Sequence, residues 1–154
     1  MTANVRSGLP RGVITLVFAA PYDADTQLVN LATGRHGYGH VAMWAGHERG
    51  GQPLVLDSGI GYGVGFRPLS IAAGGAPIRT HELCPELSRW VWRRALVFIG
   101  CEYDYAGLVR ARRSCERFTC SGLVAACLPE HLRMDLPGRV SPNDLARYFN
   151  VPPL

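Results

Sequence analysis

The sequence predicts an α+β protein in a single domain that spans residues 1–154. Two kinds of pattern predict this class. Short apolar runs bounded by turn-forming residues, such as VITLVFAA and PLVLDSG, are typical of β-strands. The segments SGLVAACL and SPNDLARYF instead have the apolar spacing and the capping residues of helices. A chain of 154 residues can bury one hydrophobic core, and no internal repeat or linker divides it.

The first elements are predicted from the N-terminal 34 residues. Residues 1–11 are expected to be a loose leader. Val13–Ala20 is expected to be a buried strand rather than the core of a signal peptide, because Pro21 is unfavourable just after a cleavage site. The segment DADTQLVNLATG predicts a short helix that is capped by Asp25 or Thr26 and stopped by the final glycine.

The middle of the chain predicts a hairpin. Its two strands are HVAMWAG and PLVLDSG, and the turn between them is HERGGQ. The following segment, GIGYGVGFRPLS, is expected to be a glycine-rich loop, and a further short strand is expected near Ile78–Glu82.

The C-terminal half predicts three helices. Pro85 opens the first, which ends before Gly100. Its expected apolar face consists of Leu87, Trp90, Val91, Ala95, Phe98 and Ile99. Cys120 precedes the second helix, SGLVAACL, which stops at the next proline. The closing helix begins with a capping box of Ser141 and Asp144.

Composition and charge exclude several classes of protein. Hydrophobic residues make up 47% of the chain and charged residues 18%, as in a globular protein. The net charge of +4 is only a weak indication of nucleic-acid binding. No aromatic-rich basic motif supports it, so we expect no nucleic-acid partner. The arginine run at 110–113 is expected to be a solvated loop. No apolar run reaches the roughly 18 residues that a membrane span needs.

The cysteines indicate a reducing compartment. They are Cys84, Cys101, Cys115, Cys120 and Cys127. Their odd number and irregular spacing favour free thiols. There is no C-x-x-C pair, and the histidines lack metal-ligand spacing, so we expect neither a metal nor a cofactor. The protein is therefore expected to be cytoplasmic at synthesis. It would need lysis or a dedicated export route to reach a cell wall.

Cys120 is the candidate nucleophile. It stands at or just before the first turn of a helix, where free backbone N–H groups and the positive end of the helix dipole favour a thiolate. The same position also fits a buried structural cysteine.

A thiolate nucleophile needs a base and a group that orients the base. His40 begins the strand HVAMWAG. A hairpin turn centred between Glu48 and Arg49 places Asp57 directly opposite His40, on the same face of the sheet. The Asp57 carboxylate could then hold the imidazole and stabilise its charged form. A slip of one residue would break this pairing, and a strand-end histidine with an unrelated aspartate is the alternative.

These residues carry a family resemblance. FTCSGLV resembles the nucleophile segment of the NlpC/P60 cysteine peptidases, in which Cys-Ser-Gly starts the central helix. In standard members the histidine follows the cysteine, whereas here it precedes it. That order resembles the circularly permuted branch, the YiiX-like permuted papain-fold amidases. Four segments are similar to successive parts of that branch: LVNLATGRHGYGHVAMWAG, LVLDSGIGYGVGFRPLS, IGCEYDYAGL and SPNDLARYF.

The resemblance implies a permuted papain-like fold of the NlpC/P60 type. In that fold the helix of Cys120 packs on a small antiparallel sheet or partial barrel. It also implies a cysteine-dependent hydrolase without cofactor that cleaves an amide bond, in a cell-wall peptide or a similar peptide, through an acyl-enzyme. Asp57 stands where that branch usually carries Glu or another polar residue. Many permuted members have Cys-Ser-Glu where this chain has Cys-Ser-Gly, which leaves the substrate class open.

The oxyanion site has several candidate donors. The backbone N–H of Cys120 is the expected donor, because it lies at a helix N-terminus. Ser121, Tyr38 and Tyr103 are the other candidates for binding the oxyanion or lining the substrate site.

Two alternatives remain open. SCERF resembles the Asn-Cys-Glu-His-Phe nucleophile segment of the lecithin:retinol acyltransferase-like enzymes. That likeness would make Cys115 the nucleophile and a lipid ester the substrate, although Ser114 and Arg117 replace the Asn and His. The sequence shows no amphipathic membrane anchor of the kind such an enzyme needs. The other alternative is a non-catalytic protein with the same fold, such as a phage-associated or interaction module.

Overall fold

The computed structural model of the protein describes residues 12–32, 37–104 and 117–154. The expected leader, the arginine run at 110–113 and Cys115 lie outside the described residues. The strands are β1 (Thr15–Ala19), β2 (His40–Arg49), β3 (Gln52–Gly59), β4 (Gly63–Pro68), β5 (Ile78–Glu82), β6 (Glu102–Tyr103) and β7 (Arg117–Phe118). The helices are α1 (Ala24–Ala32), α2 (Leu69–Ala72), α3 (Pro85–Val97), α4 (Cys120–Cys127), α5 (Glu130–Arg133) and α6 (Pro142–Tyr148).

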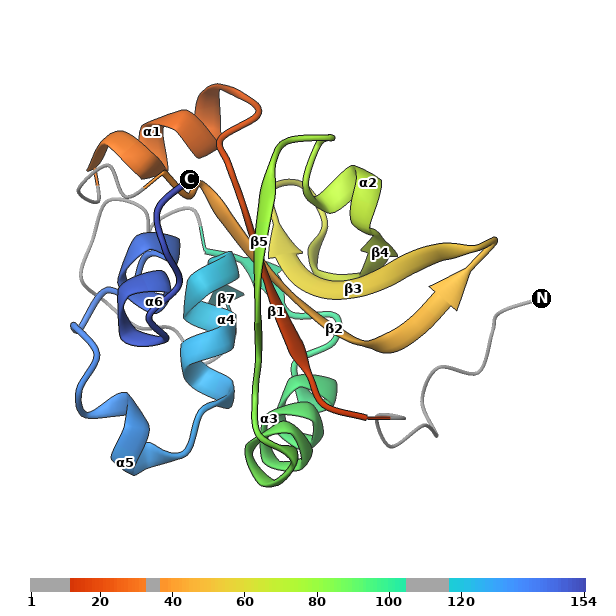
Figure 1. The fold of residues 1–154 in the computed structure, drawn as a ribbon, viewed down its shortest axis with the longest axis vertical. Helices are drawn as coiled ribbons and strands as arrows, with labels where there is room; N and C mark the ends of the chain where they lie inside the picture. The colour runs from red at the N-terminus through yellow and green to blue at the C-terminus, as the bar shows by residue number, and fades with distance from the viewer. Residues whose placement is uncertain (1–11, 33–36, 105–116) are drawn as a thin grey trace.

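An antiparallel sheet of five strands, in the order β4-β3-β2-β1-β5, forms the centre of the fold (Figure 1). Side chains alternate across β2, as the period of a strand requires. Val41 and Met43 face the main core together with residues of α3 and α4. Ala42 faces the other side, in a smaller cluster with Val55 and α2. Helices therefore cover both faces of the sheet, and the expectation of an α+β fold is confirmed.

Most of the expected elements are present. The closing helix has the predicted capping box, since the Ser141 hydroxyl accepts from the Asp144 N–H while the Asp144 carboxylate accepts from the Ser141 N–H. α3 begins at Pro85 as expected, and the strand at Ile78–Glu82 is present. None of the described helices is both long enough and apolar enough to cross a membrane.

The expected caps of α1 were wrong. The helix already begins at Ala24, and Asp23 caps it, with its carboxylate 2.8 Å from the backbone nitrogen of Thr26. Asp25 instead lies in the first turn of the helix.

The expected loop at GIGYGVGFRPLS was also wrong, because it contains β4. Two long-range backbone bonds hold this strand: the Val64 N–H donates to the Cys101 carbonyl at 2.8 Å, and the Gly100 N–H donates to the Val64 carbonyl at 2.9 Å. At Gly63 a Cβ would lie 2.1 Å from the same Cys101 oxygen, so only glycine allows this approach. The glycines that suggest a loop are therefore sites of close backbone contact.

The predicted apolar face of α3 needs one correction. Trp90 is 49% exposed, whereas Trp92 is buried. The buried stripe of the helix consists of Ser88, Val91, Trp92 and Ala95, at regular helical spacing. Ser88 can lie in the core because its hydroxyl accepts from the Ile14 N–H and donates to the Leu83 carbonyl. Because Ser88 is polar but fully hydrogen-bonded in the core, a prediction based on hydrophobicity alone missed the buried face of α3.

Candidate active site

His40 and Asp57 are in direct contact. The His40 Nε2 lies 2.7 Å from the Asp57 Oδ2, and the two residues are 6% and 1% exposed. His40 is the first residue of β2, and Asp57 lies near the end of β3. This contact uses Nε2, so Nδ1 is the imidazole nitrogen that remains for another partner.

The register that brings them together differs from the predicted one. The hairpin turns at Gly50 and Gly51, whose φ values of +61° and +77° suit a tight hairpin turn, and not between Glu48 and Arg49. Next to His40 the register pairs Met43 with Leu56.

That register puts Asp57 on the diagonal from His40 and not directly opposite it. The shift from the predicted register is even, so both side chains still share one face of the sheet. Diagonal neighbours lie within reach of each other when the side chains are long.

Arg67 is a partner of Asp57 that the sequence analysis missed. Its Nε donates to the Asp57 Oδ1, so the two carboxylate oxygens have different partners. Arg67 lies on β4, where it pairs with Val55, and this places it on the same face as Asp57. Its guanidinium carbon lies 3.0 Å from the centroid of the Tyr62 ring. Recognising β4 as a strand next to β3 would have revealed it.

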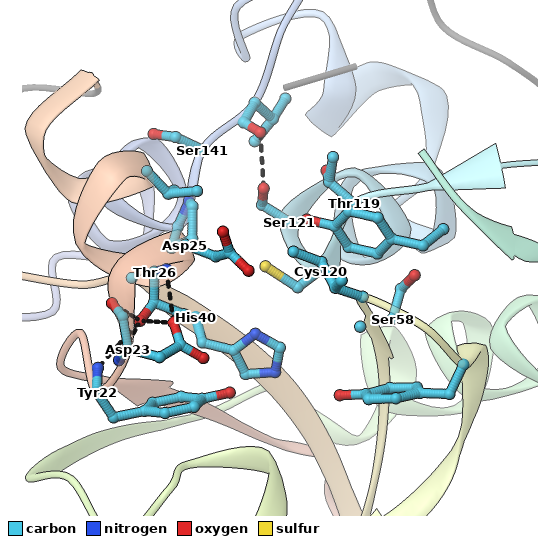
Figure 2. Close-up of a pocket in the computed structure, with 18 of the residues that line it drawn as sticks. Tyr22, Asp23, Asp25, Thr26, His40, Ser58, Thr119, Cys120, Ser121 and Ser141 are labelled. Carbon is cyan, nitrogen blue, oxygen red and sulfur yellow. Dashed lines mark hydrogen bonds between the residues drawn. The ribbon is translucent and has the colours of Figure 1, made fainter. Parts of the chain in front are cut away.

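Cys120 is the first residue of α4, as expected. The N-cap is Thr119, whose hydroxyl oxygen accepts from the Gly122 N–H at 3.0 Å. Figure 2 shows the Cys120 sulfur and the His40 ring facing the same pocket. The residue is 6% exposed.

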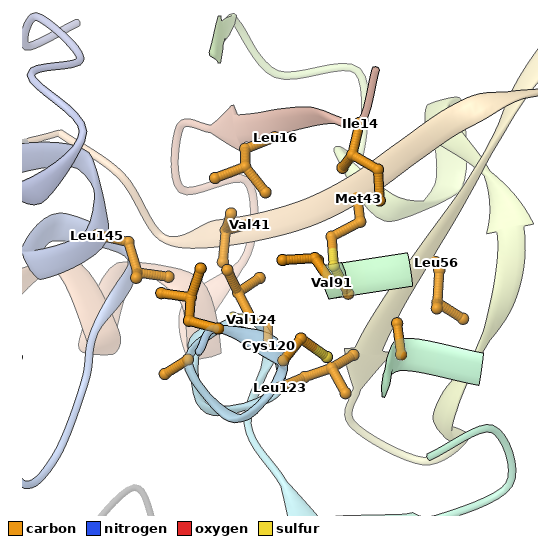
Figure 3. Packing of buried hydrophobic residues seen from close by; sticks show 14 of the residues in the cluster. Ile14, Leu16, Val41, Met43, Leu56, Val91, Cys120, Leu123, Val124 and Leu145 are labelled. Atoms are coloured by element: carbon orange, nitrogen blue, oxygen red, sulfur yellow. The ribbon is translucent and has the colours of Figure 1, made fainter. Parts of the chain in front are cut away.

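The packing of α4 fixes the position of Cys120. Leu123 and Val124 follow it by three and four residues and insert between the strands and the neighbouring helices, beside Val41 and Leu145 (Figure 3). A residue at the N-terminus of a helix docked this way has little freedom to move away from the end of β2.

Burial, charge and hydrogen bonding set the protonation of the pair. Burial alone would lower the pKa of His40, but the charge of Cys120, hydrogen bonds to Asp57 and Cys120, and the charge of Asp57 together raise it to about 10. Burial alone would raise the pKa of the Cys120 thiol, but the charge of His40, its hydrogen bond and the backbone N–H of Val41 lower it. Each partner thus favours the charged form of the other, which is a thiolate–imidazolium pair.

The pocket around the pair is a cavity of about 170 Å³. Three tyrosines line it: Tyr22, Tyr62 and Tyr103. Its charged lining residues are Asp23, Asp25 and Arg139. Tyr22 was not predicted as a lining residue, and no local sequence pattern marks it.

The other predicted lining residues have mixed outcomes. Tyr103 does line the pocket. Ser121 lines it as well, but its hydroxyl donates to the Val140 carbonyl at 2.7 Å. Tyr38 does not line it, because its ring is fully buried in the core and its hydroxyl donates to the Pro152 carbonyl. Tyr38 and Pro152 lie far apart in the sequence, so no local pattern could predict this contact.

The cysteines among the described residues form no disulfide bond. Cys84, Cys101, Cys120 and Cys127 are free thiols. Across the residues that the structure describes, no three histidine, cysteine or acidic side chains gather as a metal site would require.

Comparison with known proteins finds a likeness in fold to a solved structure. No family model matches the chain, and no curated protein matches it. Among solved structures, the chain is similar to the crystal structure of metalloprotein yiiX from Escherichia coli O157:H7, DUF1105, with a TM-score of 0.57 and 19% identity. The match covers 77% of this chain and 65% of that chain, so the chain spans less than two thirds of that protein. At this identity the likeness shows the fold alone.

Proposed function

We propose that the protein is a cysteine-dependent hydrolase of the permuted papain-like, NlpC/P60 type, which cleaves an amide bond in a cell-wall peptide or a similar peptide. One observation carries this proposal: a thiol at a helix N-terminus and an imidazole line one pocket, and a buried carboxylate contacts that imidazole. The likeness in fold to yiiX agrees with the resemblance of the sequence to the permuted branch. A purely structural cysteine would have no need of a buried imidazole with its own carboxylate.

The reaction follows from the arrangement of these groups. The Cys120 thiolate attacks the carbonyl carbon and a C–S bond forms, while the carbonyl oxygen becomes an oxyanion. The His40 imidazolium gives its proton to the leaving amine as the C–N bond breaks, which leaves an acyl-enzyme. Neutral His40 then takes a proton from water as the water oxygen bonds to the acyl carbon. The C–S bond breaks, the carboxylic acid is released, and the thiolate–imidazolium pair is restored. Throughout, Asp57 holds Nε2 and so keeps Nδ1 directed at the sulfur.

The charged rim favours a peptide as the substrate. Asp23, Asp25 and Arg139 are exposed lining residues of both signs, and they suit the polar backbone and charged ends of a peptide. A lipid ester is the second candidate, because three exposed apolar side chains also line the pocket. These are Ile60, Tyr62 and Ile71, which are 38%, 46% and 61% exposed.

Mass spectrometry after incubation with purified peptidoglycan fragments and, separately, with lipid extracts tests the proposal. We expect new peptide termini in the first mixture, and an adduct on Cys120 after rapid denaturation. The Cys120→Ala variant is the matched control. Release of fatty acid without peptide cleavage would favour the second candidate, and no change in either mixture would favour a non-catalytic protein.

The pH dependence of Cys120 alkylation and of kcat/KM should reveal the ion pair between Cys120 and His40. Because the pKa of Cys120 is lowered and that of His40 is raised to about 10, the thiolate–imidazolium pair exists at pH values between the two. We therefore expect iodoacetamide to alkylate Cys120 rapidly at pH 7, and kcat/KM to fall on the alkaline side near pH 10. An alkylation rate that rises tenfold per pH unit up to about pH 8.5, as for a free thiol, would contradict the pair.

Asp57→Asn should keep the fold but lower kcat by roughly 10- to 10⁴-fold. The amide can still contact His40, but it cannot stabilise the imidazolium by charge and can favour the wrong tautomer. Steady-state kinetics on the cleaved peptide measure this effect, and circular dichroism checks the fold. Asp135→Asn, which changes an exposed carboxylate outside the pocket, is the control. Full activity in Asp57→Asn would remove Asp57 from the mechanism.

A further inference from the structure

We propose that Tyr22 is a further catalytic residue, whose hydroxyl donates a hydrogen bond to the oxyanion that forms when the Cys120 thiolate adds to the substrate carbonyl. This inference rests on the proposed hydrolase function. It assigns the side-chain half of the oxyanion site, and the backbone N–H of Cys120 at the start of α4 supplies the other half.

Local contacts place Tyr22 firmly. It lies in the short connection between β1 and α1, where its backbone N–H donates to the Thr26 hydroxyl at 3.0 Å. The same hydroxyl donates to the Asp23 carboxylate at 2.7 Å, so the connection is tied to the first turn of α1. These bonds hold the backbone from which the Tyr22 ring projects.

Gly74 makes room for the ring. A Cβ at this position would lie 2.3 Å from the Tyr22 ring, and the φ of Gly74 is +57°. The ring therefore packs against a turn that only glycine fits well. Packing against Gly74 and hydrogen bonding of its backbone hold Tyr22 at the pocket, where it lies beneath His40 in Figure 2.

The Tyr22 hydroxyl is available as a donor. Within the described part of the chain it has no hydrogen-bond partner of its own. Burial, followed by the charges of Asp23, Asp57 and Cys120, raises the pKa of Tyr22 to about 12, so the phenol stays protonated at neutral pH. A neutral donor in this acidic surrounding is suited to a negative charge that appears only during the reaction.

The serine hydroxyls of the pocket are already engaged. Ser58 donates to the Phe118 carbonyl at 2.6 Å, and Ser121 donates to the Val140 carbonyl at 2.7 Å. Ser141 donates to the Asp144 carboxylate at 2.6 Å. Each of these would have to give up a short bond to serve the oxyanion, whereas Tyr22 gives up none.

Tyr22→Phe tests the role, because it keeps the ring on Gly74 and removes only the donor. The probe is N-acetyl-alaninal, an aldehyde that forms a tetrahedral adduct with a thiolate. Its affinity is measured as the protection of Cys120 from iodoacetamide, so no substrate is needed. We expect the variant to bind the aldehyde about 10- to 100-fold more weakly, as for a lost hydrogen bond to a charged group. Alkylation without aldehyde should be unchanged, because displacement of iodide forms no oxyanion.

The outcomes separate the two proposals. Equal aldehyde protection in Tyr22→Phe and the unchanged protein would overturn the role of Tyr22 and leave the hydrolase intact. Slower alkylation in the variant, by the same factor as the lost affinity, would also overturn it, since Tyr22 would then act on the thiolate. An aldehyde that never protects Cys120 in the unchanged protein would contradict the proposed function itself. Tyr148→Phe, on α6 and outside the pocket, is the control for loss of a tyrosine hydroxyl.

Discussion

Replacing Cys120 with alanine is expected to lower turnover by about 10⁵- to 10⁶-fold, to the limit of detection, as the loss of a catalytic nucleophile does in other triads. The acyl-enzyme cannot form without the sulfur, and no other described thiol lines the pocket. The fold should persist, since the substitution removes one atom at the edge of the core. Steady-state kinetics and mass spectrometry of the trapped acyl-enzyme measure the two consequences.

Alanine substitutions at the other cysteines distinguish an amidase from a lipid-ester hydrolase. Cys84→Ala changes an exposed thiol and should keep full activity. Cys115→Ala should keep most of it. If instead Cys115→Ala abolished turnover and Cys120→Ala did not, the amidase proposal would be wrong. The lipid-ester reading, in which Cys115 is the nucleophile, would then be favoured.

His40→Ala is expected to have the second largest effect, with turnover reduced by about 10⁴- to 10⁶-fold. The variant loses the proton donor for the leaving group. It also loses the charge and hydrogen bond that lower the pKa of Cys120, while the burial that raises it stays. Iodoacetamide alkylation of Cys120 at pH 7 should therefore slow, and it should recover at higher pH. This second readout needs no substrate.

A matched histidine control and a double variant sharpen this test. His131→Ala, on the exposed side of α5, should change neither turnover nor alkylation. Cys120→Ala and His40→Ala combined should cost little more than Cys120→Ala alone, because the two residues act as a unit. Unchanged alkylation in His40→Ala at pH 7 would show that the helix N-terminus alone activates the thiol.

The helix boundaries were the easiest features to predict. Proline at the first position of α3 and the capping box at Ser141 are local signals, which depend on contacts within one turn. Cys120 could be placed at the start of α4 for the same reason. The cap of α1 was misplaced by two residues or more, because acidic and hydroxyl side chains at three neighbouring positions all suit a helix start.

The prediction that His40 contacts Asp57 depended on the alternation of side chains along a strand, which is a weaker signal than a helix cap. The predicted turn was wrong, yet the error was an even number of residues, and alternation of side chains kept both groups on one face. An odd error would have separated them. The sequence therefore indicated which residues share a face, while the bulge between Trp44 and Glu48 and the turn at Gly50 set their spacing.

By itself, the sequence determined what rests on short-range chemistry: the α+β class, the ends of the later helices, and Cys120 at a helix N-terminus. The tertiary structure decided what rests on long-range contact. The pairing of β4 with β3 brings Arg67 to the Asp57 carboxylate, and the distant turn at Gly74 packs against the Tyr22 ring. The local sequence of one segment does not indicate which distant segment it will contact. The free energy of these contacts comes from packing and desolvation in the assembled core.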